Sequence, residues 1–138
     1  MMRAARDTLR SDTHVLAVTV LTSLDKDCEE IYSRLPPEQV RILAEMAWQS
    51  GANGFVCSPH EVAMLRERYP EALIVVPGVR SEGVEAGDQR RVGTPAKTLG
   101  AGANHIVMGR QITQSADPVA EIERVRASLT LSKLIATT

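Results

Sequence analysis

The sequence predicts an α/β fold in which the strands of a parallel sheet alternate with helices. Four short apolar runs, rich in β-branched residues, recur along the 138 residues, with roughly twenty to forty residues from one run to the next. Segments with apolar residues at helical spacing lie between the runs and after the last one. Strands and helices that alternate in this way form βα units with a parallel sheet. The four runs are 15–21, 54–57, 73–76 and 105–108.

The first third of the chain is expected to contain a helix end, a strand and a full helix. Residues 1–10 have apolar residues at helical spacing and are predicted to be the end of a preceding helix. The run 15–21 is typical of a parallel strand that is covered on both faces. A helical stripe then begins near Glu38 and stops at Gly51, a residue that suits a helix end.

The later helices begin with recognisable start signals. The stretch from Ser58 to Glu61 has a capping serine, a proline and a glutamate at capping-box spacing, which predicts a helix start. Thr94-Pro95 and Asp117-Pro118 repeat the pairing of a cap with a proline. Residues 126–138 carry no clear stop signal and are predicted to form a C-terminal tail.

Two architectures fit this rhythm, a doubly wound open sheet and part of a (β/α) barrel. A G-x-G-x-x-G motif and a P-loop are both absent, which weakens a nucleotide-binding open sheet. A barrel holds phosphate with the loops after its last two strands. The long polar loop 77–94 and Gly109-Arg110 follow the last two predicted strands. We therefore predict that residues 1–138 form a single domain, a half-barrel of about four βα units.

The composition argues against several classes of partner and site. A net charge of -1 provides no electrostatic footprint for nucleic acid or an anionic membrane, and no apolar run is long enough to span a bilayer. Cys28 and Cys57 lack metal-site spacing and suit a reducing cytosol, and residues 1–10 contain no apolar signal core. We expect a cytoplasmic protein without a metal, a cofactor, a nucleic-acid partner or a membrane partner.

Three polar features attract attention, and each also has an ordinary structural explanation. The run Asp25 to Asp27 is expected to be a solvated surface, since adjacent loop residues diverge. His60 lies at a predicted helix start, where a solvated histidine is commoner than a catalytic one. Cys57 ends a predicted buried strand and is expected to be a core residue.

Five linked blocks of sequence resemble a known family. They are LAVTVLTS (16–23), VCSP (56–59), VPGVR (76–80), DQRRVGTP (88–95) and VMGRQIT (107–113). In order and spacing they resemble the C-terminal half of bacterial orotidine 5'-phosphate decarboxylases. The resemblance extends from about Met1 to Val125. It implies that the predicted half-barrel is the C-terminal half of a TIM (β/α)8 barrel.

The resemblance implies a set of residues that bind the 5'-phosphate of the nucleotide. Arg110 and the backbone amide of Gly109 would hold the phosphate, with Arg80 as a second cation. A guanidinium can bind a phosphate through two parallel hydrogen bonds, which a lysine does not reproduce. Gln89 would bridge the phosphate and the pyrimidine.

A second set of residues is implied for the pyrimidine. Thr22 and Ser23 would donate and accept hydrogen bonds at the ring, near the carboxylate that is lost. Pro77 would form part of the wall beside the base. These residues imply that the ligand is a pyrimidine nucleotide, either orotidine 5'-phosphate or its product, uridine 5'-monophosphate.

The catalytic groups of the family have no counterpart in this sequence. The family uses an Asp-x-Lys-x-x-Asp motif in its N-terminal half, where the charged array displaces the carboxylate and protonates the carbanion. The three lysines of this chain are Lys26, Lys97 and Lys133, and none has an aspartate two residues before it and another three after it. No catalytic residue is therefore predicted here, and the chain alone is expected to be inactive.

Two functions of different class remain open at this point. In the first, the chain is a fragment of a lyase of pyrimidine biosynthesis and carries its substrate-binding half. In the second, it is an inactive half-barrel that binds at most a phosphorylated ligand. Open sheet edges and an uncovered apolar face favour a homodimer or a larger assembly in that case. A related sugar-phosphate barrel is a weaker third reading, because the Thr22, Ser23 and Gln89 blocks favour a pyrimidine.

Overall fold

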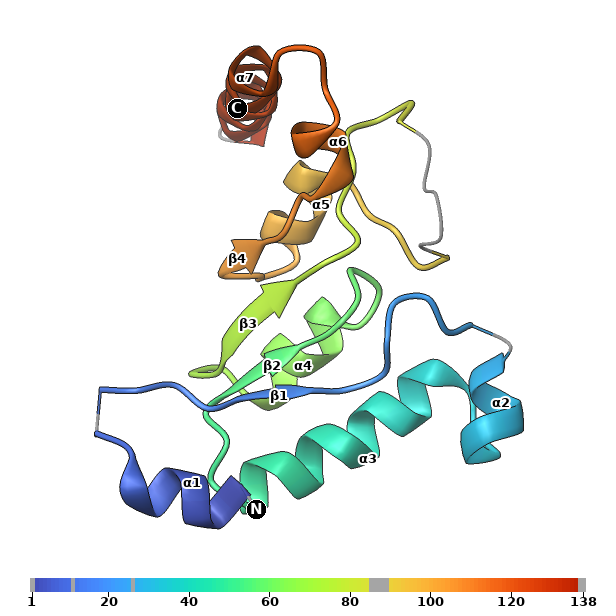
Figure 1. The fold of residues 1–138 in the computed structure, drawn as a ribbon, viewed down its shortest axis with the longest axis vertical. Coiled ribbons are helices and arrows are strands. Elements are labelled where there is room, and N and C mark those ends of the chain that lie inside the picture. Colours follow the sequence, from blue (N-terminus) through green and yellow to red (C-terminus); the bar gives the residue numbers. More distant parts are fainter. Residues whose placement is uncertain (1, 11, 26, 85–89, 137–138) are drawn as a thin grey trace.

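The computed structural model describes residues 2–10, 12–25, 27–84 and 90–136, which are arranged around one four-stranded sheet (Figure 1). All three strand pairings are parallel, and the strands lie side by side in chain order. The predicted α/β fold with a parallel sheet is confirmed. The strands are β1 (Leu16–Val18), β2 (Gly54–Val56), β3 (Leu73–Val76) and β4 (His105–Ile106).

The strand order decides between the two predicted architectures. A doubly wound sheet reverses its strand order at a switch point. Here the order β1-β2-β3-β4 has no reversal. The register aligns Ala17 of β1 with Phe55 of β2, and Phe55 with Ile74 of β3. This order is the one found along the wall of a (β/α) barrel.

Helices flank the sheet along the described chain, and two of their boundaries bear on the predictions. The helix expected within residues 1–10 is present, and the last helix runs through residues 126–136, which corrects the predicted start of a tail. Neither glycine nor proline interrupts the sequence there, so the helix continues. The helices are α1 (Met2–Thr8), α2 (Asp27–Tyr32), α3 (Pro36–Gln49), α4 (Val62–Arg68), α5 (Pro95–Gly100), α6 (Arg110–Thr113) and α7 (Pro118–Ala136).

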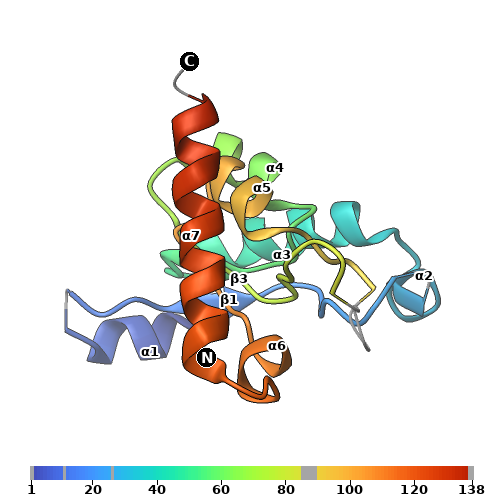
Figure 2. The same ribbon diagram turned by 90° about the horizontal axis from the view of Figure 1, so that it is seen from above.

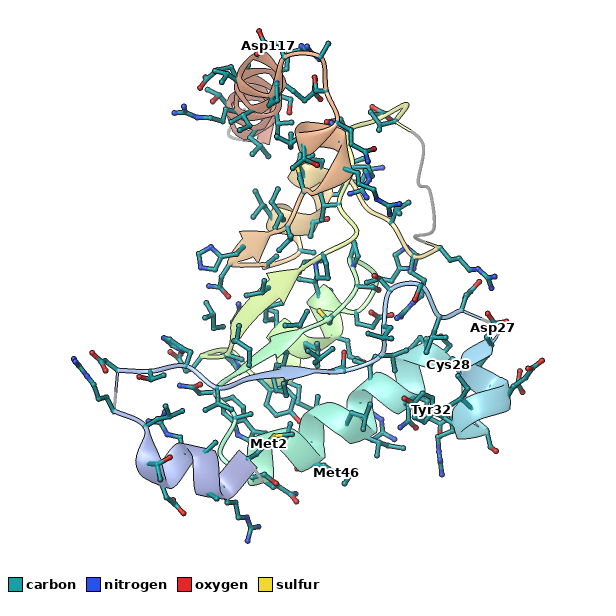
Figure 3. The ribbon with its side chains drawn as sticks, in the orientation of Figure 1. Met2, Asp27, Cys28, Tyr32, Met46 and Asp117 are labelled. Carbon is teal, nitrogen blue, oxygen red and sulfur yellow. The ribbon has the colours of Figure 1, made fainter. Side chains whose placement is uncertain are left out.

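Of the two later helix starts predicted from a capping residue followed by proline, α7 has its side-chain cap and α5 does not. The Asp117 carboxylate accepts hydrogen bonds from the backbone N–H groups of Val119 and Ala120, at 3.1 and 3.0 Å, and so caps α7 (Figure 3). Thr94 precedes Pro95 in an extended conformation, with proline in the first turn of α5 as predicted.

The core lies between one face of the sheet and the helices α3 and α4, which run along that face (Figures 1 and 2). Phe55 and Ile74 of the central strands are fully buried there. The Phe55 ring lies 5.0 Å from the Tyr69 ring and 6.0 Å from the Trp48 ring, measured between centroids. Burial of these side chains holds α3 and α4 against the strands.

The opposite face of β1 is not covered. Leu16 and Val18 are 37% and 60% exposed, while Ala17 between them is buried. The prediction that the first strand is covered on both faces is therefore wrong. In a closed barrel this face points into the barrel and meets the other strands.

Candidate functional site

The segments that follow the four strands meet along one edge of the sheet, because parallel strands all end on the same side. Figure 1 shows the chain leaving β1, β2 and β3 towards this side. In barrels with parallel strands this edge holds the active site. The residues predicted to bind the nucleotide, apart from Gln89, come directly after β1, β3 and β4. Gln89 lies outside the described residues.

The end of β1 lies against the far end of the long loop. Thr22 is buried and Ser23 is half-buried, and the Thr22 carbonyl oxygen accepts a hydrogen bond from the Arg90 amide at 3.4 Å. The two hydroxyl residues predicted to contact the pyrimidine therefore lie beside a residue adjacent to Gln89. Arg90 also forms a surface ion pair with Asp27, at 2.9 Å.

The loop after β3 turns sharply and pairs with its own return segment. Gly78 has a φ of 76°, a left-handed conformation that favours glycine. The Arg80 amide donates to the Gly93 carbonyl at 3.0 Å, and the Gly93 amide donates to the Gly78 carbonyl at 3.4 Å. Pro77 is half-buried at the start of this turn. The two ends of the long loop are thus held together at the strand end.

Arg80 is held close to the backbone of this turn. Its guanidinium donates to the Val79 carbonyl at 2.8 Å, and the residue is buried. Within the described ranges, no carboxylate forms an ion pair with Arg80. A largely buried cation without a carboxylate partner creates a positive potential that favours an anion.

A side chain from α6 joins the ends of β3 and β4. The Gln111 amide oxygen accepts a hydrogen bond from the Ser81 backbone N–H at 2.9 Å, and its amide nitrogen donates to the Ser81 hydroxyl at 2.7 Å. Ser81 follows Arg80, and Gln111 follows Arg110, so these bonds bring the backbones of the two arginines to one corner of the edge. Figure 1 shows α6 beside the segment that leaves β3. The same Gln111 nitrogen donates to Glu121 of α7 at 2.7 Å.

Gly109 lies at the tip of this corner, just before α6. It is exposed, and among the described residues no protein atom other than those of its chain neighbours lies within 4 Å of the place that a Cβ would occupy. The packing of the described protein atoms therefore does not itself require glycine at this position. Open space over the Gly109 backbone, with the exposed Arg110 directly after it, leaves room for a ligand oxygen at the corner.

A buried ion pair that the sequence analysis did not predict lies below the edge. The Arg91 guanidinium is 2.5 Å from the Glu61 carboxylate, and both side chains are almost fully buried. The Glu61 carboxylate accepts a hydrogen bond from the Ser58 backbone N–H at 3.1 Å, which is one of the two bonds of a capping box. Helix α4 nevertheless begins only at Val62. The predicted helix start at Pro59 is therefore wrong, because the Ser58 hydroxyl donates to the Glu61 carboxylate and the Glu61 amide bonds the Ser58 carbonyl in a turn, at 3.2 Å, instead of being capped by that hydroxyl.

The two cysteines are core residues. Both are buried free thiols, and burial, together with the nearby negative charge of Glu61, raises the pKa of Cys57 to about 12. A thiol with this pKa remains protonated at neutral pH and is not a nucleophile. Figure 3 shows Cys28 at the start of α2, beside Asp27. The Asp27 carboxylate forms the surface ion pair with Arg90.

The remaining polar candidates have ordinary surroundings. Asp27 is part of a solvated surface, as expected for the Asp25 to Asp27 run, although Lys26 lies outside the described residues. His60 is exposed, with a ring nitrogen 3.2 Å from the Val92 carbonyl oxygen. Over the described ranges no group of three or more metal-ligating side chains occurs, and no helix is long and apolar enough to cross a bilayer.

Comparison with known proteins gives a consistent result. The family model described as "Orotidine 5'-phosphate decarboxylase / HUMPS family" matches residues 1–125. The orotidine 5'-phosphate decarboxylase of Sphingopyxis alaskensis is 44% identical over 131 residues, which cover 94% of this chain and 58% of that protein. The orotidine 5'-phosphate decarboxylase of Moorella thermoacetica is 46% identical over 123 residues, which cover 86% of this chain and 49% of that protein.

Solved structures show the same partial match. The crystal structure of orotidine 5'-phosphate decarboxylase from Lactobacillus acidophilus aligns with a TM-score of 0.71 at 37% identity, over 94% of this chain and 58% of that one. The enzyme from Sulfolobus solfataricus aligns with a TM-score of 0.66 at 15% identity, a similarity that concerns the fold alone. The chain thus spans about half to three fifths of the length of these relatives.

Proposed function

Because the chain belongs to the orotidine 5'-phosphate decarboxylase / HUMPS family, we propose that it carries the nucleotide-binding half of such a decarboxylase. The whole enzyme would convert orotidine 5'-phosphate into uridine 5'-monophosphate and carbon dioxide. The observation that carries the proposal is the pair of Ser81–Gln111 hydrogen bonds, because it brings Arg80 and Arg110 to one corner of the strand-end edge.

The phosphate is proposed to bind at this corner. Arg110 would bind two phosphate oxygens through its fork, Gly109 would offer its backbone amide over open space, and Arg80 would add positive charge from below. Gln89 is assigned here on the family resemblance alone. A dianionic phosphate between two arginines offsets their charge and keeps hydrogen bonds at its oxygens.

The pyrimidine is proposed to lie towards β1. Thr22 and Ser23 follow this strand, and the Thr22 carbonyl contacts the Arg90 amide, which places the far end of the long loop beside them. Pro77 at the end of β3 would wall one side of the base. The base would then span the distance between the β1 end and the phosphate corner at β3 and β4.

The chemistry is proposed to come from residues outside this sequence. Decarboxylation in the family depends on the Asp-x-Lys-x-x-Asp array, which none of the three lysines here can form. The binding half would contribute binding energy that is used to hold the reacting carbon against that array. We propose a cytoplasmic location, where the two buried cysteines would stay as thiols.

Calorimetric titration of the purified chain tests this proposal. We expect saturable binding of uridine 5'-monophosphate at one site per chain and binding of uridine that is weaker by about two orders of magnitude, because uridine lacks the charge-assisted phosphate contacts. Equal affinity for the two compounds, or a folded chain that binds neither, would contradict the proposal.

A second candidate function is self-association without catalysis, favoured by the uncovered face of β1. Val18 is 60% exposed on that face, and β1 and β4 are the two outer strands of the described sheet. Unpaired parallel strands next to exposed apolar side chains favour association. Two copies that meet through these faces would form a homodimer with a barrel-like core.

Sedimentation equilibrium of the chain and two variants tests the self-association. We expect a dimer or a larger species for the chain and a shift towards monomer for Val18→Lys. Ile31→Lys is the matched control, because Ile31 is also 60% exposed but belongs to α2, which lies apart from the strands (Figure 1). A monomer at all concentrations, or an equal shift in both variants, would exclude the proposed interface.

A further inference from the structure

Arg91 connects three segments at the functional edge of the sheet. One terminal nitrogen of its guanidinium lies 2.5 Å from the Glu61 carboxylate, in the segment between β2 and α4. The other donates to the carbonyl oxygens of Val20 and Leu21, at 3.2 and 3.0 Å, in the segment after β1. Arg91 itself belongs to the segment between β3 and α5. A single side chain therefore joins the ends of three strands.

Glu61 extends the connection into the end of β2. Its second carboxylate oxygen accepts hydrogen bonds from the backbone N–H and the hydroxyl of Ser58. Ser58 is fully buried, and Arg91 and Glu61 are 3% and 2% exposed. We call the three residues Ser58, Glu61 and Arg91 the strand-end clamp.

The clamp lies next to residues that the proposed function uses. The backbone amide of Arg90 donates to the Thr22 carbonyl. Gly93 pairs with the backbone on either side of Val79, at Gly78 and Arg80. A Cβ on Gly93 would come within 2.5 Å of Pro59, so this return segment is also packed tightly against the end of β2. Displacement of Arg91 would move the loop end away from Thr22, while the Ser81–Gln111 hydrogen bonds keep the turn after Arg80 in place.

The physical character of the clamp favours a role in geometry. Removing two charges from water is costly, and their attraction in the interior roughly offsets that cost, so a buried ion pair contributes little net stability. A buried network with nearly all of its hydrogen bonds formed does, however, select one arrangement of the backbone around it. Here that backbone is the set of three strand ends.

We infer that Arg91 and Glu61 are positioning residues for the pyrimidine side of the nucleotide site. They act by holding the segment after β1, with Thr22 and Ser23, against the return segment of the long loop. The phosphate corner is held separately, by the Ser81–Gln111 hydrogen bonds. The inference rests on the proposed function for the identity of the ligand.

The chain offers a matched control in Arg66. Its guanidinium also binds backbone carbonyls of separate segments, Gly102 at 3.0 and 2.9 Å and Ala72 at 2.9 Å. These carbonyls precede β4 and β3, so Arg66 acts at the amino ends of the strands, opposite the candidate site. Arg91→Met and Arg66→Met therefore each remove one guanidinium that bonds backbone carbonyls, at opposite ends of the strands.

The test compares uridine 5'-monophosphate with ribose 5-phosphate in both variants, at a temperature at which each is fully folded. For Arg91→Met we expect the affinity for uridine 5'-monophosphate to fall by about tenfold or more, while the affinity for ribose 5-phosphate changes by less than about twofold. For Arg66→Met we expect both affinities to stay within about twofold. An equal loss for both ligands in Arg91→Met, or the same selective loss in Arg66→Met, would overturn the inference.

Amide hydrogen exchange provides a readout that does not depend on the ligand. In Arg91→Met we expect faster exchange confined to the segments around Thr22, Ser58 and Arg90, whereas Arg66→Met accelerates exchange around Ala72 and Gly102. Faster exchange spread over the whole sheet in Arg91→Met would overturn the inference. If the unmodified chain binds neither ligand, the proposed function fails, and the exchange pattern still decides whether the clamp holds the strand ends.

Discussion

Mixing this chain with the N-terminal half of a related decarboxylase is expected to produce decarboxylation of orotidine 5'-phosphate. This chain would bring the phosphate corner at Arg80 and Arg110, and the other half would bring the Asp-x-Lys-x-x-Asp array. The exposed face of β1 gives the two pieces a surface on which to meet. Catalysis requires both, because the array acts only on a substrate that the phosphate contacts hold in place.

The complementing piece can be taken from the Sphingopyxis alaskensis enzyme, which is 44% identical to this chain over the matched part. We expect turnover on the order of 1 per second in the mixture, a typical enzymatic rate. A mixture with Arg110→Ala in this chain, or with the array lysine changed to alanine in the other piece, is the control and should be inactive. A folded complex without turnover would contradict the assignment of this chain to the binding half.

Arg110→Ala is expected to weaken the binding of uridine 5'-monophosphate by about one hundredfold. Hydrogen bonds to charged groups contribute about 1.5 to 3 kcal/mol each, and a guanidinium fork on phosphate makes two of them. Arg110→Lys should recover only part of the loss, because an ammonium group lacks the planar fork. The measurement is calorimetry on the three proteins under identical conditions.

A nearby arginine provides the control for general loss of positive charge. Arg126 on α7 is exposed and forms an ion pair with Glu123 at 2.8 Å, whereas the phosphate corner is bonded to Glu121 through Gln111. Arg126→Ala is expected to change the affinity by less than about twofold, since exposed charges contribute little beyond screened attraction. If Arg126→Ala weakened binding as much as Arg110→Ala, a specific phosphate contact at Arg110 would be excluded.

The alternation of strands and helices was predictable because it depends on local periodicity. The strand 73–76 appears with the predicted limits, and the β1 run was predicted to be longer than the strand Leu16–Val18. The difference has a physical reason, because the carbonyls of Val20 and Leu21 are bonded to Arg91 and have left the sheet. A long-range contact of this kind leaves no mark on the pattern of apolar residues.

The candidate site was predictable where a family block carried it and unpredictable where only tertiary contacts define it. Gly109, Arg110 and Arg80 stood out as a glycine and two cations after strands. In the sequence, Glu61 has a local explanation as part of a capping box, so the pattern does not predict its partner 30 residues away. Gln111 is a further residue whose role becomes visible only when the ends of β3 and β4 are seen together.

The most direct test of the central claim is a decarboxylation assay on the purified chain alone, with orotidine 5'-phosphate at saturating concentration. The claim is that the chain binds the nucleotide and contains no group that displaces the carboxylate or protonates the carbanion. The predicted result is no formation of uridine 5'-monophosphate above the rate in buffer. Measurable turnover that disappears in Arg110→Ala would contradict the claim, because it would show that this sequence contains the catalytic groups as well.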